Sequence, residues 1–525
     1  MSMFNRIHTL LISTVVACLF STYTIHAQDF ELLEATISDV HQAFESGQLT
    51  CHKLTSQYLE RIAAYDATGP TLNSIEIVNP NALQEAEFLD TQFSRSGLTG
   101  PLHCIPVLLK DQVETRDMPT TYGSAVFENF MTNRDATIVT RMREAGALLL
   151  AKTTMGEFAS RYVGSGFGVI RNAYDPTRNP SGSSGGTGAG IAANFGMVGI
   201  GEDTGGSIRG PAAVHSLVGL RPTVPLISRY GMMPANPSSD TLGPITRTVT
   251  DTAILLHVLA GYDPNDPVTA YAVDHVPESY TTDLDRNGLQ GARIGIIRAP
   301  MDPNTDTTST DYQKVRTVID QAFRDLQELG AVLIDSVSLA HLESIEDTYS
   351  GNSYETEEAT DAYLAEHEHA PVTTLREILL SGEVTPWRAK GLMGLIGKTT
   401  SDPGYLKILT ARERLRQSVL TTMADQGLDA LVYATFDHQT TFIASDVLIN
   451  PDTEDQYALG NNRYLSPVIG FPALTVPAGF TSDNLPIGLE FLGRPFTEAT
   501  LLRFGYAYEQ GTHRRQPPAT TPALP

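Results

Sequence analysis

Two glycine-rich serine stretches and one lysine carry the residue types that acyl transfer needs. Residues 181–186 read Ser-Gly-Ser-Ser-Gly-Gly, and residues 201–211 read Gly-Glu-Asp-Thr-Gly-Gly-Ser-Ile-Arg-Gly-Pro. Lys110 follows the apolar run at 105–109. A hydroxyl becomes a strong nucleophile only when a base removes its proton, and Ser-Lys variants of the catalytic triad achieve this without histidine. The combination therefore indicates a serine nucleophile served by a lysine base.

The second stretch predicts a strand, a sharp turn and the start of a helix. The apolar run Met197–Ile200 leads into it, and an Ala/Val-rich segment follows. Glycines lack Cβ, so backbone N–H groups in the turn can face a bound atom. A helix beginning near Ser207 would add the positive end of its dipole. Ser207 is therefore expected beside donors that could hold a developing oxyanion.

Lys110 has the surroundings that a lysine base requires. Lysine acts as a base only when it is neutral, and burial lowers its pKa toward that state. The run at 105–109 predicts a buried strand with Lys110 at its end, where ligands gather in open α/β sheets. The adjacent Asp111 would spoil this base by pairing with it, and residue types alone leave that alternative open.

Each feature alone has a commoner structural explanation. A glycine-rich loop is usually a turn, and a lysine after a strand is usually exposed. The order and spacing of all three features are much more specific than any one of them.

The motifs together resemble the amidase signature family. That family combines a strand-end Lys-Asp pair, a GGSSGG-type loop and a D-x-GGS-x-R-x-P-A run about two dozen residues later. The matching segments here are Lys110-Asp111, residues 181–186 and residues 203–212. The likeness continues at 219–223, 228–231, 242–249, 467–477 and 485–489. It covers the chain from about residue 31 to about residue 513, less clearly between 340 and 460.

The resemblance implies a role for each matching residue. Ser207 would be the nucleophile, Ser183 a bridging serine that follows a cis peptide bond, and Lys110 the terminal base. Asp111 would point away from Lys110. The oxyanion hole would be formed by the backbone N–H groups of Thr204, Gly205 and Gly206. Asp203 and Arg209 are interpreted as a structural ion pair that braces the loop.

Some positions depart from the common family pattern. Ser181 replaces the first glycine of the loop, as in the peptide-amidase-like branch. Ala173, Thr154 and Gly156 also replace commoner residues. No catalytic group is lost, but these departures weaken any transfer of substrate preference.

Composition limits the classes of partner. The chain has 525 residues, 41% of them hydrophobic, and a formal net charge of −24. Nucleic-acid binding favours a basic surface, so this charge argues against it, and it also disfavours anionic membrane surfaces. There is no P-loop, HExxH or paired CxxC motif. We expect no cofactor, no metal, no nucleic-acid partner and no stable membrane span; a homodimer stays open.

The first 27 residues have the pattern of a secretory signal. Arg6 supplies a positive n-region, residues 10–20 an apolar h-region, and residues 21–27 a polar c-region. Cleavage after Ala27 is the first choice and predicts a secreted or periplasmic protein. Lipoprotein processing at Cys18 and an uncleaved anchor are alternatives, the latter weakened by the short apolar run. Cys51 and Cys104 would then remain, enough for one disulfide.

Alternating strand and helix patterns predict an α/β fold. Strands are expected at 105–109, 147–151, 293–298 and 331–337, with helices at 134–145, 184–194, 250–261 and 312–329. This rhythm predicts a sheet covered by helices on both faces. The resemblance implies a large mixed sheet in one catalytic domain over 28–525.

Residues 340–460 form the segment that is expected to vary with substrate. The segment holds Trp387, Leu392 and Met393, which we interpret as the acyl-side wall of the pocket. His367 and His369 have a spacing that could hold a metal, although a solvated helix face is the commoner explanation of such a charged run.

The sequence therefore predicts a secreted serine amidase acting on a small-molecule or peptide amide. Peptide C-terminal amides, aryl acylamides, fatty amides and small aliphatic amides all stay open, with a slight preference for the first. The rivals are a glutaminase subunit of an amidotransferase and a catalytically silent binding protein on the same fold.

Overall fold

The computed structural model describes residues 30–350, 354–457 and 459–524. The predicted signal segment, 1–27, lies outside the described residues, so it stays a prediction. None of the described helices combines the length and hydropathy needed to cross a bilayer.

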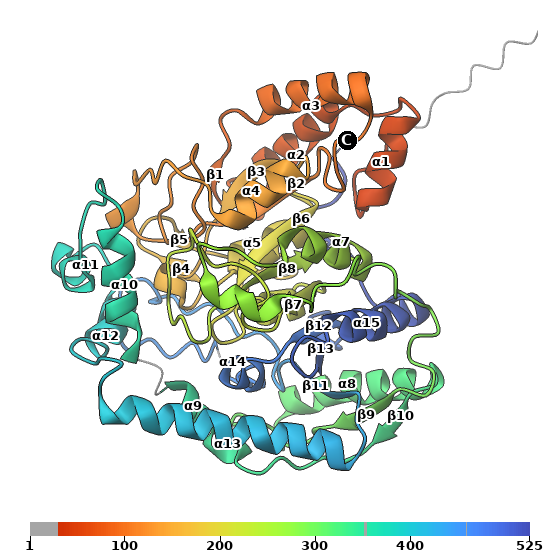
Figure 1. Ribbon diagram of the computed structural model, residues 1–525, viewed down its shortest axis with the longest axis vertical. Coiled ribbons are helices and arrows are strands. Elements are labelled where there is room, and N and C mark those ends of the chain that lie inside the picture. The colour runs from red at the N-terminus through yellow and green to blue at the C-terminus, as the bar shows by residue number, and fades with distance from the viewer. Residues whose placement is uncertain (1–29, 351–353, 458, 525) are drawn as a thin grey trace, which may run out of the picture.

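A mixed sheet forms the centre of the molecule (Figure 1). In the described part of the chain it has eleven strands in the order β1-β3-β2-β6-β8-β7-β12-β13-β11-β9-β10. The pairs β2–β3, β2–β6, β9–β10 and β9–β11 are parallel and the others antiparallel. The strands are β1 Ile75–Val78, β2 Pro106–Lys110, β3 Leu148–Thr153, β6 Val198–Glu202, β7 Val218–Arg221, β8 Leu242–Thr246, β9 Arg293–Ile296, β10 Val332–Ile334, β11 Ala430–Ala434, β12 Ala473–Phe480 and β13 Pro486–Leu492. The predicted large mixed sheet is confirmed.

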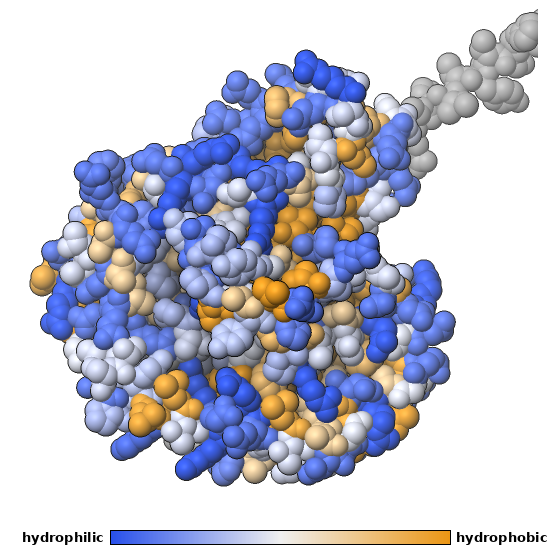
Figure 2. Space-filling view, in the orientation of Figure 1, coloured by the Kyte–Doolittle hydropathy of each residue, from blue (hydrophilic) through white to orange (hydrophobic). Residues whose placement is uncertain are grey.

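Helices cover both faces of this sheet. α5 packs on β2 and β6, α7 on β8, and α8 and α15 on β12. The helices are α1 Ile37–Glu45, α2 Cys51–Tyr65, α3 Ala82–Ser96, α4 Thr137–Glu144, α5 Gly185–Ala192, α6 Arg209–Ala213, α7 Val249–Leu259, α8 Thr310–Glu328, α9 Ile345–Ser350, α10 Thr356–Ala365, α11 Leu375–Ser381, α12 Pro386–Met393, α13 Pro403–Asp425, α14 Leu465–Ile469 and α15 Glu498–Thr512. The visible face is mostly hydrophilic with scattered hydrophobic side chains, as the high acidic content predicts (Figure 2).

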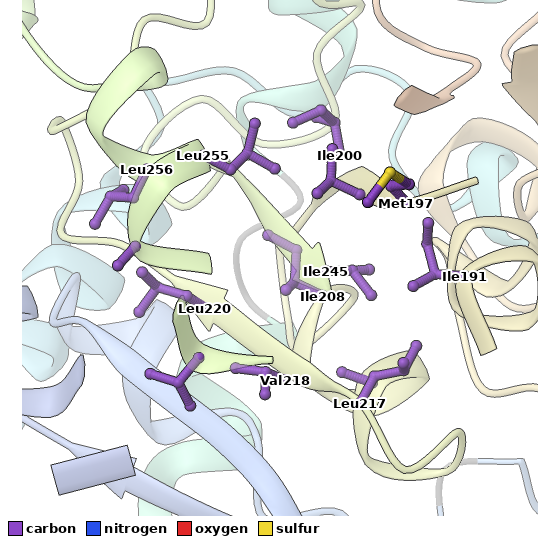
Figure 3. Close-up of a cluster of buried hydrophobic side chains, with 14 of the residues drawn as sticks. Ile191, Met197, Ile200, Ile208, Leu217, Val218, Leu220, Ile245, Leu255 and Leu256 are labelled. Atoms are coloured by element: carbon purple, nitrogen blue, oxygen red, sulfur yellow. The ribbon is translucent and has the colours of Figure 1, made fainter. Parts of the chain in front are cut away.

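The core anchors the segment that follows β6. Ile208, the residue after Ser207, is fully buried and points into the cluster with Ile200, Ile245 and Leu220 (Figure 3). This burial fixes one end of the loop that carries Ser207, since a buried isoleucine contributes about 1.5–3 kcal/mol relative to an exposed one.

The helix expected near Ser207 begins two residues after it and is short. α6 starts at Arg209 and has five residues. The turn before it is organised by a side chain, because the Asp203 carboxylate accepts the N–H groups of Gly206 and Ile208 at 2.6 and 3.2 Å. A helix dipole therefore contributes little beside Ser207.

The C-terminal tail is held against the N-terminal helices (Figure 1). Arg61 of α2 is buried, and its guanidinium donates to the carbonyls of Thr521 and Pro522 at 2.9 and 2.8 Å. It also donates to the carbonyls of Ala193 and Asn194, which follow α5. One side chain thus joins α2, the end of α5 and the tail.

Cys51 and Cys104 form a disulfide, which settles the pairing that the sequence left open. The bond joins the start of α2 to the loop before β2 and closes a separation of 53 residues. Cross-linking across a loop of this length restricts the unfolded chain and stabilises the native state by about 2–4 kcal/mol.

We expect the Cys51→Ser/Cys104→Ser variant to lose about 2–4 kcal/mol of unfolding free energy. Urea unfolding of the purified protein measures this change. Dithiothreitol should weaken the wild type by a similar amount and leave the variant unchanged. An unaltered midpoint in the double variant would contradict the stabilising role.

Candidate active site

Lys110 lies at the end of β2 with its side chain fully buried. Its Nζ donates to Ser183 Oγ at 2.8 Å, to Glu202 Oε2 at 2.8 Å and to the Glu202 carbonyl at 3.3 Å. Burial lowers the pKa of Lys110 below its ordinary value, and the Glu202 carboxylate opposes this shift. Lys110 and Ser183, 73 residues apart in the chain, are therefore in direct contact in a buried environment.

Asp111 points away from Lys110, as the resemblance implied. Its Oδ2 accepts hydrogen bonds from the backbone N–H and the hydroxyl of Thr121, at 2.8 and 2.5 Å. Its Oδ1 lies 3.6 Å from Nζ of Lys152, the neighbouring buried lysine on β3. The carboxylate that does pair with Lys110 is Glu202, which the sequence reasoning missed.

Ser183 is positioned by a loop that permits no larger residue before it. The Gly182–Ser183 peptide bond is cis. A Cβ on Gly182 would overlap the Arg161 carbonyl oxygen, so only glycine fits this close approach. α5 begins two residues after Ser183, at Gly185.

Ser207 lies in the loop between β6 and α6 and is 8% exposed. In the described part of the chain its hydroxyl forms no hydrogen bond. The structure therefore brings Lys110 to Ser183 and the Ser207 loop to Glu202, but it records no hydrogen bond between Ser183 and Ser207. The Ser207 hydroxyl is free to approach a substrate.

One of the three predicted oxyanion donors is already engaged. The N–H of Gly206 donates to Asp203 Oδ1 at 2.6 Å, so the prediction for Gly206 is corrected. Among the described residues, the N–H groups of Thr204, Gly205 and Ser207 donate to no protein group. These three amides are the donors that remain for an oxyanion.

Arg463 links the two serine loops and was also missed from sequence. Its Nη1 donates to the Gly206 carbonyl at 3.1 Å and to Ser181 Oγ at 3.3 Å. Its Nε donates to Asn461 at 2.7 Å, which fixes the side chain. A lysine could not reproduce this planar set of contacts.

A buried ion cluster braces the loop that carries Ser207. Arg209 Nε donates to Asp203 Oδ2 at 3.1 Å, Arg209 also bonds Glu490 of β13, and Arg221 Nη1 lies 3.2 Å from Asp203 Oδ1. Burial by itself would raise the pKa of Asp203, but Arg209 and Arg221 hold that pKa well below its usual range. The predicted Asp203–Arg209 pair is thus one edge of a larger network.

We expect Asp203→Asn to lower the free energy of unfolding by about 3–5 kcal/mol, because it leaves buried guanidinium charge without its partner. The depressed pKa means that this contribution is present above the unfolded-state pKa of aspartate and is lost as pH falls through the folded-state value. Urea unfolding at pH 7 measures the first effect, and a series from pH 5 down to about pH 2 measures the second. Asp283→Asn, at an exposed carboxylate, is the control and should leave the midpoint unchanged. A wild-type midpoint in Asp203→Asn would contradict the bracing role.

The variable segment contributes directly to the surroundings of the loop. The Tyr349 hydroxyl occupies the space that a Cβ on Gly205 would need, and the Tyr349 ring stacks on Tyr464 at 3.9 Å. A nearby cavity of about 520 Å³ is lined by residues that include Arg161, Tyr457 and Tyr464. A larger cavity of about 800 Å³ contains none of the predicted site residues.

The predicted wall residues have different surroundings. Trp387 lies against the Arg161 guanidinium at 4.1 Å, and Leu392 is buried in a cluster with Tyr122 and Phe158. Met393 is 59% exposed. Trp387 thus contacts a residue that lines the cavity of about 520 Å³, whereas Met393 is not enclosed.

His367 has a partner other than a metal. Its Nε2 lies 2.8 Å from Glu114 Oε1. Within the part of the chain that the structure describes, no three His, Cys, Asp or Glu side chains converge as metal ligands.

Comparison with known proteins identifies relatives along nearly the whole chain. The family model described as Amidase matches residues 53–502. A probable amidase of Arabidopsis thaliana is 32% identical over 512 residues, covering 93% of this chain and 92% of that protein. A glutamyl-tRNA(Gln) amidotransferase subunit of Chloroflexus aurantiacus is 35% identical over 524 residues, covering 93% and 99%. The native peptide amidase of Stenotrophomonas maltophilia superposes with a TM-score of 0.83 at 35% identity, covering 94% of this chain and 99% of that one.

The fold and the site define an α/β protein in which a buried lysine at the C-terminal end of β2 contacts Ser183 of one serine loop and Glu202, which precedes the other. The chain belongs to the amidase signature family. The resemblance predicted from the motifs is confirmed.

Proposed function

We propose that this protein is a serine amidase that hydrolyses carboxamide C–N bonds through an acyl-enzyme on Ser207 and releases ammonia or an amine. The observation that carries this proposal is the buried 2.8 Å hydrogen bond between Lys110 Nζ and Ser183 Oγ, next to the Ser207 loop. The family and the similarity to a peptide amidase support it.

The proposed reaction uses a proton relay of three side chains. Ser207 Oγ attacks the amide carbonyl as its proton passes to Ser183 Oγ, and the Ser183 proton passes to the neutral amine of Lys110. The amides of Thr204, Gly205 and Ser207 stabilise the oxyanion, and one such donor is typically worth about 3 kcal/mol. The relay then returns the proton to the leaving nitrogen, because an amide anion is too basic to leave. Water hydrolyses the acyl-enzyme by the reverse path.

A panel of amides tests the function and its substrate class. Purified protein is assayed for release of ammonia or amine from peptide C-terminal amides, aryl acylamides, fatty amides and small aliphatic amides. We expect C-terminal peptide amides to be preferred, since the Ser181 loop and the similarity to a peptide amidase both favour them. Absence of hydrolysis across the panel, together with no labelling of Ser207 by a fluorophosphonate, would favour the silent binding protein.

The second candidate is a glutaminase subunit of an amidotransferase. It is favoured by the 35% identity to an amidotransferase subunit over 93% of this chain. The acidic charge and the predicted export signal argue against it. Glutaminase activity that requires a partner protein would support it over the free-standing amidase.

We also propose that the protein is exported after cleavage near Ala27. The Cys51–Cys104 disulfide supports this, because disulfides persist mainly in oxidising compartments. N-terminal sequencing of the protein recovered from its native host tests this cleavage. A mature protein that begins at a lipid-modified Cys18 would contradict cleavage near Ala27 and support lipoprotein processing.

A further inference from the structure

A second carboxyl lies behind the Lys110–Glu202 ion pair. The Thr204 hydroxyl is 2.6 Å from Glu202 Oε1 and 2.8 Å from Asp240 Oδ1, while Glu202 Oε2 is 2.8 Å from Lys110 Nζ. Glu202, Asp240 and Lys110 are all fully buried. A line of hydrogen-bond distances thus runs from Ser183 through Lys110, Glu202 and Thr204 to Asp240.

The Thr204 hydroxyl has one proton and cannot donate to both carboxylates. If it donates to Glu202, its lone pair accepts a proton carried by Asp240 Oδ1. Two buried carboxylates on one hydroxyl also repel each other, which favours protonation of one of them. Since Lys110 faces Glu202, the ionised member is Glu202 and the protonated member is Asp240.

The remaining charges near this group are consistent with that assignment. The N–H groups of Ala235 and Asn236 donate to the other oxygen of Asp240 and by themselves lower its pKa, but no arginine or lysine bonds it in the described part of the chain. Burial, and then the neighbouring Glu202, raises the pKa of Asp240 to about 7. The other titratable and charged side chains near Lys110, Glu202 and Asp240 are Asp203, Arg221 and Tyr122.

We propose that Glu202, held by Thr204 and a protonated Asp240, is a positioning residue that sets the protonation of Lys110 and balances the ammonium formed when Lys110 takes the serine proton. In that step the Ser183 Oγ–H bond breaks, the Nζ–H bond forms, and the Ser207 proton moves to Ser183. Glu202 stays a carboxylate throughout. It does for the lysine what the buried aspartate does for histidine in a Ser-His-Asp triad.

The inference rests on the proposed function, and its pH dependence has a definite sign. Burial lowers the pKa of Lys110, and the carboxylate of Glu202 raises it again, whereas a protonated Asp240 carries no charge that could add to this effect. Removing the Glu202 charge therefore makes the amine of Lys110 neutral at a lower pH. If Glu202 had only a structural role, replacing it would slow the reaction without moving the pH at which Lys110 loses its proton.

The rate at which a fluorophosphonate labels Ser207, measured from pH 5 to pH 10, tests the inference without a known substrate. For Glu202→Gln we expect the acid limb to move down by about one pH unit or more, and the plateau rate to fall about tenfold or more because the ammonium lacks its counter-ion. For Asp240→Asn we expect the acid limb to stay at its wild-type position, because the amide replaces a protonated carboxyl without a change of charge and can make the same contacts with Thr204, Ala235 and Asn236. Glu509→Gln is the matched control, since burial also raises the pKa of that carboxyl to about 7 but it bonds the N–H of Val249 instead; its profile should be unchanged.

The outcomes separate the inference from the function on which it rests. An acid limb that stays at its wild-type position in Glu202→Gln, or one that moves in Asp240→Asn, would overturn the inference while leaving the amidase proposal in place. The Asp240→Asn variant gives this reading even if Glu202→Gln fails to fold. A wild type that is never labelled at Ser207 would overturn the proposed function, and the inference with it.

Discussion

Ser207→Ala is expected to abolish turnover on any amide that the wild type cleaves, with a loss on the order of 10⁶-fold in kcat. The reason is chemical, because the other hydroxyl of this loop, that of Thr204, is held between Glu202 and Asp240 and cannot replace the Ser207 hydroxyl. The measurement is single-turnover hydrolysis with excess enzyme, in which the wild type accumulates or passes through an acyl-enzyme detectable by mass spectrometry.

Ser228→Ala is the matched control for this experiment. Ser228 is also fully buried, but its hydroxyl bonds Asp263 and lies outside the two serine loops. Its activity should stay near that of the wild type. If Ser207→Ala kept appreciable turnover, the nucleophile would have to be sought elsewhere.

Lys110→Ala should reduce kcat/KM by about 10²–10⁴-fold, the range typical for loss of a positioned general base. The structure gives the reason, since Lys110 Nζ is 2.8 Å from Ser183 Oγ and burial lowers its pKa toward the neutral amine. Lys110→Arg should be no better, because a guanidinium stays protonated and cannot accept the serine proton. The measurement is kcat/KM against pH for each variant.

Lys152 provides a control with the same chemistry. It is the neighbouring fully buried lysine, its pKa is also lowered by burial, and it donates to the Pro119 carbonyl and to Thr120 at 2.7 Å. We expect Lys152→Met to lose stability but to keep the pH profile of the folded fraction. Wild-type activity of Lys110→Ala near neutral pH would refute the base assignment.

The parts of the site that could be predicted are those encoded by short local motifs. Lys110 ends an apolar run that became β2, and residues 201–211 combine the end of β6 with a glycine turn. The fold class followed from alternating strand and helix patterns together with the motifs. The helix expected near Ser207 begins at Arg209, and the Asp203 carboxylate that accepts two N–H groups of the turn before it could not be predicted from the spacing.

The parts that could not be predicted depend on contacts between distant segments. Glu202 lies inside a recognised motif, yet nothing in its neighbourhood shows that it faces Lys110, 92 residues earlier. Arg463 bonds Gly206 across 257 residues, and Glu490 reaches Arg209 across 281. Such partners are set by the order of strands in the sheet, which residue types alone do not specify.

The tail contacts of Arg61 bear on how the protein should be engineered. Removing Thr521 and Pro522 would leave two guanidinium N–H groups of a buried arginine without acceptors, at a cost of about 1–3 kcal/mol each. A truncation library should therefore stop short of these residues. An affinity tag fused after these residues needs a flexible spacer, so that the Thr521 and Pro522 carbonyls can still accept hydrogen bonds from Arg61 of α2.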